Sequence, residues 1–170
     1  MFRIHPETPS DRAEVEVLFD LAFAPGRTAL SSYRLREGAA PERELSLAAR
    51  DDYDTLAAAI RYWRVRIGAA GHAALLLGPV AVHPTRQGEG LGALLIAESL
   101  ALAEKGGWTR VILVGDASYY RRFGFTREAA LALDFPPPTN PDRLLARALT
   151  PGAFEGVAGM VLAWADGRGD

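Results

Sequence analysis

The sequence has no cysteine, only one lysine and only three histidines. The lack of cysteine excludes disulfide bonds, a thiolate nucleophile and a cysteine zinc site. His5, His72 and His83 stand far apart and do not show the spacing of metal ligands, so we expect no bound metal.

A long apolar run and a large net charge are also missing. No run approaches the length of a membrane span, and the N-terminal residues 1–5 do not form the apolar centre of a signal peptide, so we expect a cytoplasmic protein. The net charge of −2 gives no electrostatic case for binding nucleic acid or an anionic membrane. The 170 residues predict one domain over residues 1–165 and a frayed tail at 166–170.

The hydrophobic pattern predicts a chain that mixes helices with strands. Ser10 is expected to cap the first helix. The predicted order as far as the strand at 131–135 is β-α-α-β-β-β-α-β-α-β, which is typical of an α+β or mixed α/β fold. Strands are expected at 2–5, 45–50, 55–67, 75–82, 110–114, 131–135, 143–149 and 157–164, and helices at 11–24, 28–37, 91–104 and 118–123.

A strand, a glycine-rich turn and a helix follow one another over residues 75–104. The apolar run ends at Pro84, a turn spans residues 85–90, and a segment rich in Leu and Ala then favours a helix. The first turn of a helix has backbone N–H groups without a partner inside the helix. Gly88, Gly90 and Gly92 have no side chains that would keep a ligand away from those groups. The unit therefore predicts an anion site suited to phosphate or pyrophosphate.

The spacing of these glycines separates several phosphate-binding motifs. A P-loop needs Lys followed by Ser or Thr after its last glycine, whereas Ala93 and Leu94 follow Gly92. A dinucleotide fingerprint would use Gly88, Gly90 and Ala93, with Asp116 after the next strand as its acidic residue. Ala93 in place of the last glycine weakens the dinucleotide-binding interpretation but does not exclude it.

Two motifs together favour another family. The first is Gln87-x-x-Gly90-x-Gly92, preceded by Val-Ala-Val-His-Pro at 80–84, and the second is Tyr-Tyr-Arg-Arg-Phe-Gly-Phe at 119–125. In this order and spacing they resemble the GNAT superfamily of N-acetyltransferases, over roughly residues 75–125. The resemblance implies a central mixed, mostly antiparallel sheet flanked by helices. It also implies acetyl-CoA as cosubstrate and direct transfer of its acetyl group to a primary amine of a small molecule or peptide.

The resemblance also implies roles for particular residues. Tyr120 lies four residues before Gly124, where the superfamily often has the tyrosine that protonates the departing thiolate, although Tyr119 is an alternative. Arg121 and Arg122 are within reach of the CoA phosphates or form a solvated face. The backbone of Val80, Ala81 and Val82 would pair with the pantetheine arm, and the pyrophosphate would lie on Gln87, Gly88, Glu89, Gly90, Leu91, Gly92 and Ala93, with Arg86 as a further candidate.

The general base stays open. Many members of the superfamily have a carboxylate on the strand after the motif helix, and Val111–Val114 has none. Asp116 is either a base or the cap of the next short helix, and we favour the cap. His83 has a suitable intrinsic pKa but stands in a turn before proline, and a chain of water molecules is a further alternative.

The acceptor pocket is expected between the N-terminal helices, the turn at 51–54 and the loop at 136–141. Two other functions compete with acetyl transfer: an acyl-CoA-binding regulatory module without catalysis, and a nucleotide-binding domain of another family. Exposed C-terminal strands make a homodimer a candidate assembly. The candidate pocket-lining residues are Tyr33, Arg34, Arg36, Tyr62 and Trp63.

Overall fold

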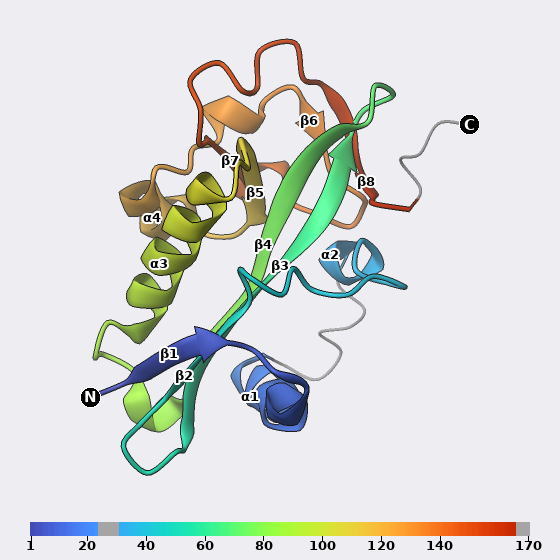
Figure 1. Ribbon diagram of the computed structural model, residues 1–170. Coiled ribbons are helices and arrows are strands. Elements are labelled where there is room, and N and C mark those ends of the chain that lie inside the picture. Colours follow the sequence, from blue (N-terminus) through green and yellow to red (C-terminus); the bar gives the residue numbers. More distant parts are fainter. Residues whose placement is uncertain (24–30, 166–170) are drawn as a thin grey trace.

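The computed structural model describes residues 1–23 and 31–165. Its elements follow the predicted order (Figure 1). The strands are β1 (Arg3–Pro6), β2 (Leu47–Arg50), β3 (Leu56–Ile67), β4 (His72–Val82), β5 (Arg110–Val114), β6 (Leu133–Asp134), β7 (Leu144–Ala148) and β8 (Gly159–Ala163). The α-helices are α1 (Arg12–Ala22), α2 (Ser31–Arg34), α3 (Leu91–Lys105) and α4 (Ala117–Tyr120), and short 3₁₀ helices lie at Pro9–Asp11, Pro84–Arg86, Arg121–Phe123, Glu128–Ala130 and Pro141–Arg143.

One mixed sheet organises the molecule, with the strand order β1-β2-β3-β4-β5-β7. All neighbours along this path are antiparallel except β4 and β5, which are parallel and joined by α3. The last strand, β8, pairs with the end of β3 and, in parallel, with β6. The predicted mixed, mostly antiparallel sheet flanked by helices is therefore confirmed.

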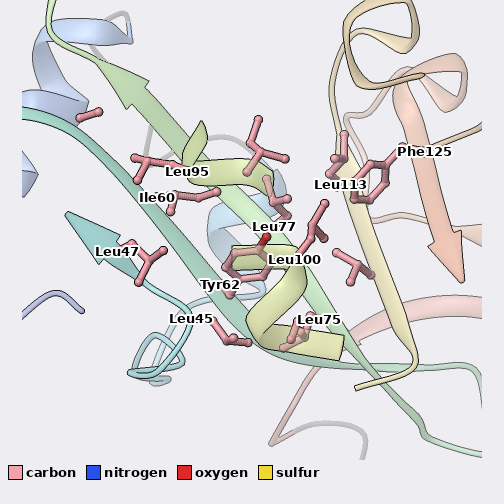
Figure 2. Close-up of a cluster of buried hydrophobic side chains, with 14 of the residues drawn as sticks. Leu45, Leu47, Ile60, Tyr62, Leu75, Leu77, Leu95, Leu100, Leu113 and Phe125 are labelled. Atoms are coloured by element: carbon pink, nitrogen blue, oxygen red, sulfur yellow. The ribbon is translucent and has the colours of Figure 1, made fainter. Parts of the chain in front are cut away.

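Helix α3 covers one face of this sheet. Its Leu95 and Leu100 pack on Ile60, Leu75 and other apolar side chains of the central strands, as Figure 2 shows. Within this core the hydroxyls of Tyr62 and Ser99 lie 2.7 Å apart and satisfy each other's hydrogen bond. The helix stops where Gly106 and Gly107 follow it, as a glycine C-terminus predicts.

The opposite face of the sheet is covered by α1 and by the segment after α2. Val15, Leu18 and Phe19 of α1 pack against Ala48, Leu56, Ala59 and Ala81 of the sheet. Leu35 packs against Trp63 of β3 in a separate cluster. Trp63 and its chain neighbour Tyr62 face opposite sides of the sheet, because successive side chains alternate along a strand.

Three local predictions differ from the structure or lie outside it. Ser10 is not the cap of the first helix; the Asp11 carboxylate instead accepts hydrogen bonds from the N–H and hydroxyl groups of Thr8, so a 3₁₀ turn precedes α1. The predicted helix at 28–37 is shortened to α2, and its residues 28–30 lie outside the described residues, as does the predicted tail at 166–170. Within the described residues, no helix is long and apolar enough to cross a membrane.

The parallel strands β4 and β5 separate along their length. They pair only where Leu75 and Leu76 face Val111 and Ile112. Beyond that point β4 continues to Val82 without β5 beside it, and in Figure 1 β5 accompanies only the upper part of β4. This opening between two strands of the same sheet positions the candidate site.

Candidate active site

The open edge of β4 presents backbone groups to the gap. The N–H of His83 donates to the carbonyl of Ala57 on β3, at 2.7 Å, and Val82 and Val80 lie opposite Ala58 and Ile60. In an antiparallel pair, alternate residues bond to the neighbouring strand and the residues between them point their polar groups the other way. The N–H and C=O groups of Val80 and Val82 therefore face the gap, where an extended ligand can pair with them.

The glycine turn leads from this edge to the N-terminus of α3. Gly88 and Gly90 adopt left-handed conformations with φ of 88° and 77°, which glycine adopts without a steric penalty. A Cβ built on either residue meets no atom within 4 Å, so the turn borders open space. Gly90 is the N-cap and provides no capping side chain. The N–H groups of the first helical turn therefore have no side-chain partner at the cap, and together with the helix dipole they favour an anion at the N-terminus of α3.

The charged side chains of this turn already contact one another. The guanidinium of Arg86 donates to the Asp51 carboxylate at 2.7 Å and lies 3.7 Å from the Glu89 carboxylate. Gln87 and Glu89 are exposed. Arg86, a further candidate for the phosphate site, therefore has its charge balanced by Asp51.

A cavity of about 510 Å³ opens where β4 and β5 separate, a volume within the usual range of small-molecule sites. Its walls come from both separating strands, from α4, from Arg143 and from the segment around α2. The described lining residues are Phe23, Ser32, Tyr33, Arg36, Leu76, Leu77, Gly78, Pro79, Val80, Val114, Gly115, Asp116, Tyr119, Tyr120 and Arg143.

Tyr119 and Tyr120 both line this cavity, with their rings edge to face and 5.0 Å between centroids. The ring of Tyr120 lies against Gly115, because a Cβ built on Gly115 would stand 2.6 Å from Cε2 of Tyr120. The hydroxyl of Tyr119 lies nearer the start of α3, 3.7 Å from a Cβ built on Gly92. The ring of Tyr120 and the hydroxyl of Tyr119 therefore lie against different elements, the first beside the end of β5 and the second beside the start of α3.

The hydroxyl of Tyr120 keeps its proton at neutral pH. Burial, and secondly the neighbouring Tyr119, raise the pKa of Tyr120 to about 12, because the ionised form loses solvation. The same loss of solvation penalises any thiolate formed in the cavity, so a protonated tyrosine is suited to donating to it.

Two residues considered as bases have structural roles. The Asp116 carboxylate accepts hydrogen bonds from the N–H and the hydroxyl of Ser118, at 3.0 and 2.8 Å, and caps α4. These bonds lower the pKa of Asp116. The ring of His83 bonds to the hydroxyl and N–H of Thr85 and caps the turn after β4.

The predicted pocket-lining residues divide into two groups. Tyr33 and Arg36 line the cavity, whereas Tyr62 is fully buried in the core and Arg34 is exposed outside the cavity. Trp63 stands behind the wall and donates from Nε1 to the carbonyl of Gly78 at 2.7 Å. Neither the 51–54 turn nor the 136–141 loop contributes to the described lining, which corrects that expectation.

Arg143 was not among the predicted lining residues, because the apolar pattern placed it in the strand expected at 143–149. It lies instead just before β7, at the end of a 3₁₀ turn, and its Nε donates to the carbonyl of Gly115 at 3.4 Å. The antiparallel pairing of β5 with β7 carries it to the cavity. Its position as a charged residue at the start of a predicted strand was the only signal in the sequence.

The family model of the Acetyltransferase (GNAT) domain matches residues 42–127, about half of the chain and the part that runs from β2 to α4. The chain belongs to the GNAT family of acetyltransferases. It is 27% identical over 158 residues to the Uncharacterized N-acetyltransferase YhbS of Escherichia coli (strain K12), and the match covers 93% of each chain.

Two solved structures resemble this GNAT protein closely. The structure of Escherichia coli YhbS in complex with CoA matches with a TM-score of 0.82 and 26% identity, covering 95% of this chain and 89% of that one. The structure of a GNAT family acetyltransferase from Brucella melitensis in complex with acetyl-CoA matches with a TM-score of 0.69 and 31% identity, covering 89% and 90%.

Among residues 1–23 and 31–165, no group of three or more His, Asp or Glu side chains is placed to hold a metal ion.

Proposed function

We propose that this GNAT acetyltransferase transfers the acetyl group of acetyl-CoA directly to a primary amine of a small molecule or peptide. The observation that carries the proposal is the gap beside β4, which runs from the cavity to the uncapped N-terminus of α3. YhbS with CoA and the Brucella melitensis enzyme with acetyl-CoA share this fold. Together these findings support acetyl-CoA as the cosubstrate.

The proposed cosubstrate site uses the two exposed sets of backbone groups. The groups of Val80 and Val82 that face the gap would pair with the pantetheine arm, with Ala81 between them bonded toward β3. The pyrophosphate would lie on the first turn of α3, where N–H groups and the helix dipole favour anions. The residues proposed to receive it are Gln87, Gly88, Glu89, Gly90, Leu91, Gly92 and Ala93.

The proposed reaction forms one bond and breaks another. The lone pair of the neutral amine attacks the thioester carbonyl carbon, the C–N bond forms, and the C–S bond breaks with its electron pair leaving on sulfur. A backbone N–H of β4 at the gap stabilises the oxygen that becomes negative during attack. Tyr120 donates its hydroxyl proton to the thiolate. The proton lost from the amine passes to solvent, and solvent returns a proton to the Tyr120 oxygen.

Calorimetric titration tests the cosubstrate. We expect acetyl-CoA to bind with micromolar or tighter affinity, and NAD and ATP to bind at least tenfold more weakly, because the gap accommodates the pantetheine arm that those nucleotides lack. Absence of acetyl-CoA binding at concentrations that would reveal micromolar affinity would contradict the proposal and the regulatory alternative together. Preferential binding of NAD or ATP would favour a nucleotide-binding function.

Substitution of Tyr120 by Phe tests the proton donor. We expect kcat to fall by about 10²-fold, the usual contribution of general acid catalysis, while the Kd for acetyl-CoA changes little. The matched control is Tyr119→Phe, which removes the other hydroxyl of the same cavity. A fall in kcat only in Tyr119→Phe would assign the proton donor to Tyr119. An equal fall in kcat in both variants would remove the specific role proposed for Tyr120.

We also propose that residues 1–165 form one domain, since α1, α3 and the segment after α2 all pack on the same sheet. The homodimer stays a prediction.

A further inference from the structure

The turn between β2 and β3 meets the glycine turn at residues 85–90. The first turn, at 51–54, directly follows β2, and the second leads from β4 to α3 (Figure 1). The guanidinium of Arg86 donates from Nη2 to Oδ2 of Asp51 at 2.7 Å. The sequence predicted the 51–54 turn at the acceptor pocket, whereas the structure brings it beside the glycine turn.

Asp51 is held in place by its own turn. Its Oδ1 accepts hydrogen bonds from the N–H groups of Tyr53 and Thr55, both at 2.9 Å, and its backbone N–H donates to the Thr55 carbonyl at 3.0 Å. Only 10% of its side chain is exposed. The bond from the Thr55 N–H, and secondly that from Arg86, lower the pKa of Asp51, so the carboxylate is charged at neutral pH. Asp51 therefore offers Arg86 a fixed and ionised partner.

Arg86 links this fixed partner to the glycine turn. Among residues 85–90, all of which the structure describes, only Arg86 is not exposed. Its Nη1 lies 3.7 Å from the Glu89 carboxylate, and its central carbon lies 5.4 Å from the ring centroid of Phe2. One guanidinium therefore spans the turn as far as Glu89 and joins it to Asp51 outside the turn.

The composition of the glycine turn gives this contact its importance. Gly88 and Gly90 provide the left-handed conformations that the turn requires. Glycine also loses more conformational freedom on folding than any other residue, so the ordering of this turn is costly in entropy. In a turn that is loose before binding, this cost falls on the binding step and weakens affinity. A contact that orders the turn in the free protein therefore strengthens binding.

We propose that Asp51 is a positioning residue for the cosubstrate: through Arg86 it holds the glycine turn in the conformation that receives the pyrophosphate. The inference rests on the proposed acetyl-CoA site and adds a residue that acts on it from outside. Arg86 is the link between the two turns and not a phosphate ligand, because its two terminal nitrogens already face Asp51 and Glu89.

Electrostatics alone predicts the opposite effect when the charge of Asp51 is removed. A carboxylate near an anion site repels the anion, so neutralising it should strengthen the binding of acetyl-CoA. A positioning role predicts weaker binding, because the glycine turn loses its fixed contact. The direction of the change in Kd therefore separates the two effects.

Calorimetric titration of Asp51→Asn with acetyl-CoA measures this direction. Asparagine keeps an oxygen that can accept the bonds from Tyr53 and Thr55, and it replaces the oxygen that faces Arg86 with an NH₂ group. We expect the Kd to rise about threefold, within the range that partly exposed ion pairs contribute. The matched control is Asp52→Asn, which removes the same charge from the same turn at a carboxylate that pairs with the N-terminus. Its Kd should equal that of the wild type or be lower.

Variants of Arg86 assign the effect to the ion pair. Arg86→Gln should also raise the Kd about threefold, and Arg86→Lys should recover part of the affinity. The double variant of Asp51→Asn with Arg86→Gln should bind no more weakly than either single variant, because the two changes break one interaction. Amide NMR of the free protein gives a second readout: the heteronuclear NOE of Gly88 and Gly90 should fall in Asp51→Asn and stay unchanged in Asp52→Asn.

The outcomes separate the inference from the function on which it rests. Tighter or unchanged binding in Asp51→Asn would overturn the positioning role, and tighter binding together with a loss in Arg86→Gln would make Arg86 a phosphate ligand. Equal weakening in Asp51→Asn and Asp52→Asn, or weakening that adds up in the double variant, would also overturn it. Failure of the wild-type protein to bind acetyl-CoA would instead contradict the proposed function.

Discussion

The arginines of this protein differ in what surrounds their guanidinium groups. Arg50 is nearly buried and donates to Asp11 at 2.7 Å and to Glu14 at 3.0 Å, and Arg61 is held by two glutamates in the same way. Arg36 is equally buried but lies against aromatic rings at a cavity. The first kind ties α1 and the N-terminal segment to the sheet, and the second forms part of the cavity wall. The distinction depends on neighbours rather than on residue type.

The pair of Asp11 and Arg50 leads to a prediction about pH. Although burial alone would raise it, hydrogen bonds from Thr8 and Arg50 lower the pKa of Asp11 to about 2, against 3.8 for the free residue. The folded state therefore binds fewer protons than the unfolded state between pH 4 and 2. The stabilisation is complete above that window and disappears as the pH falls through it.

We expect Asp11→Asn to reduce the free energy of unfolding by about 2 kcal/mol at pH 7, the usual value for hydrogen bonds to charged groups. The difference from wild type should shrink as the pH falls from 4 to 2, in urea titrations at each pH. Asp52→Asn, at an exposed carboxylate, is the control and should change stability by less than about 0.5 kcal/mol. If the loss of unfolding free energy in Asp11→Asn stayed constant with pH, the lowered pKa of Asp11 would not be the source of the stabilisation.

Side-chain partners were the least predictable feature from the sequence. The cap formed by Asp116 was predicted because capping depends on the next two residues. The prediction that Ser10 caps the first helix was wrong, because the Asp11 carboxylate accepts a hydrogen bond from the N–H of Thr8. The local sequence allows either arrangement. The location of Arg143 at the cavity depends on pairing with a strand about 30 residues earlier in the chain, which local patterns do not encode.

The unit of β4, the glycine turn and α3 was predictable because its signals are local. Apolar residues, a glycine cluster and helix formers follow one another, and the observed bounds of α3 differ from the prediction by one residue at its end. The partners of β8 were not predictable, since it joins the end of β3 although nearly 100 residues separate them. Local patterns do not encode the separation of β4 from β5, and the family resemblance implied only that the backbone of residues 80–82 would pair with the pantetheine arm.

The N-terminus of α3 leads to a prediction about the proposed anion site. Gly92→Glu places a carboxylate beside the first-turn N–H groups, where it competes with the pyrophosphate for the helix dipole. We expect the Kd for acetyl-CoA to rise at least tenfold in calorimetry, without loss of folding, because glutamate favours a helix more than glycine does. Leu102→Glu, on an exposed part of the same helix, should change the Kd by less than twofold. Equal weakening of acetyl-CoA binding in both variants would indicate an effect of the protein's net charge and not of a site at the N-terminus of α3.

The sheet separates the two proposed reactants. Helix α3, where the cosubstrate is proposed to bind, lies on one side, and α1 with the segment after α2 lies on the other (Figure 1). The gap between β4 and β5 is the place where the cavity reaches β4 backbone groups that no strand pairs. Direct transfer fits this arrangement, because the amine and the thioester would meet at the opening from opposite faces.

Backbone amide NMR during titration with acetyl-CoA tests the cosubstrate site most directly. We expect large chemical-shift changes at the amides that face the gap or begin α3, and little change at the β3–β4 turn at 68–71, which lies at the far end of these strands. Changes confined to other surfaces, or no change at saturating acetyl-CoA, would contradict the account. The amides expected to respond are those of Val80, Val82, Leu91, Gly92 and Ala93.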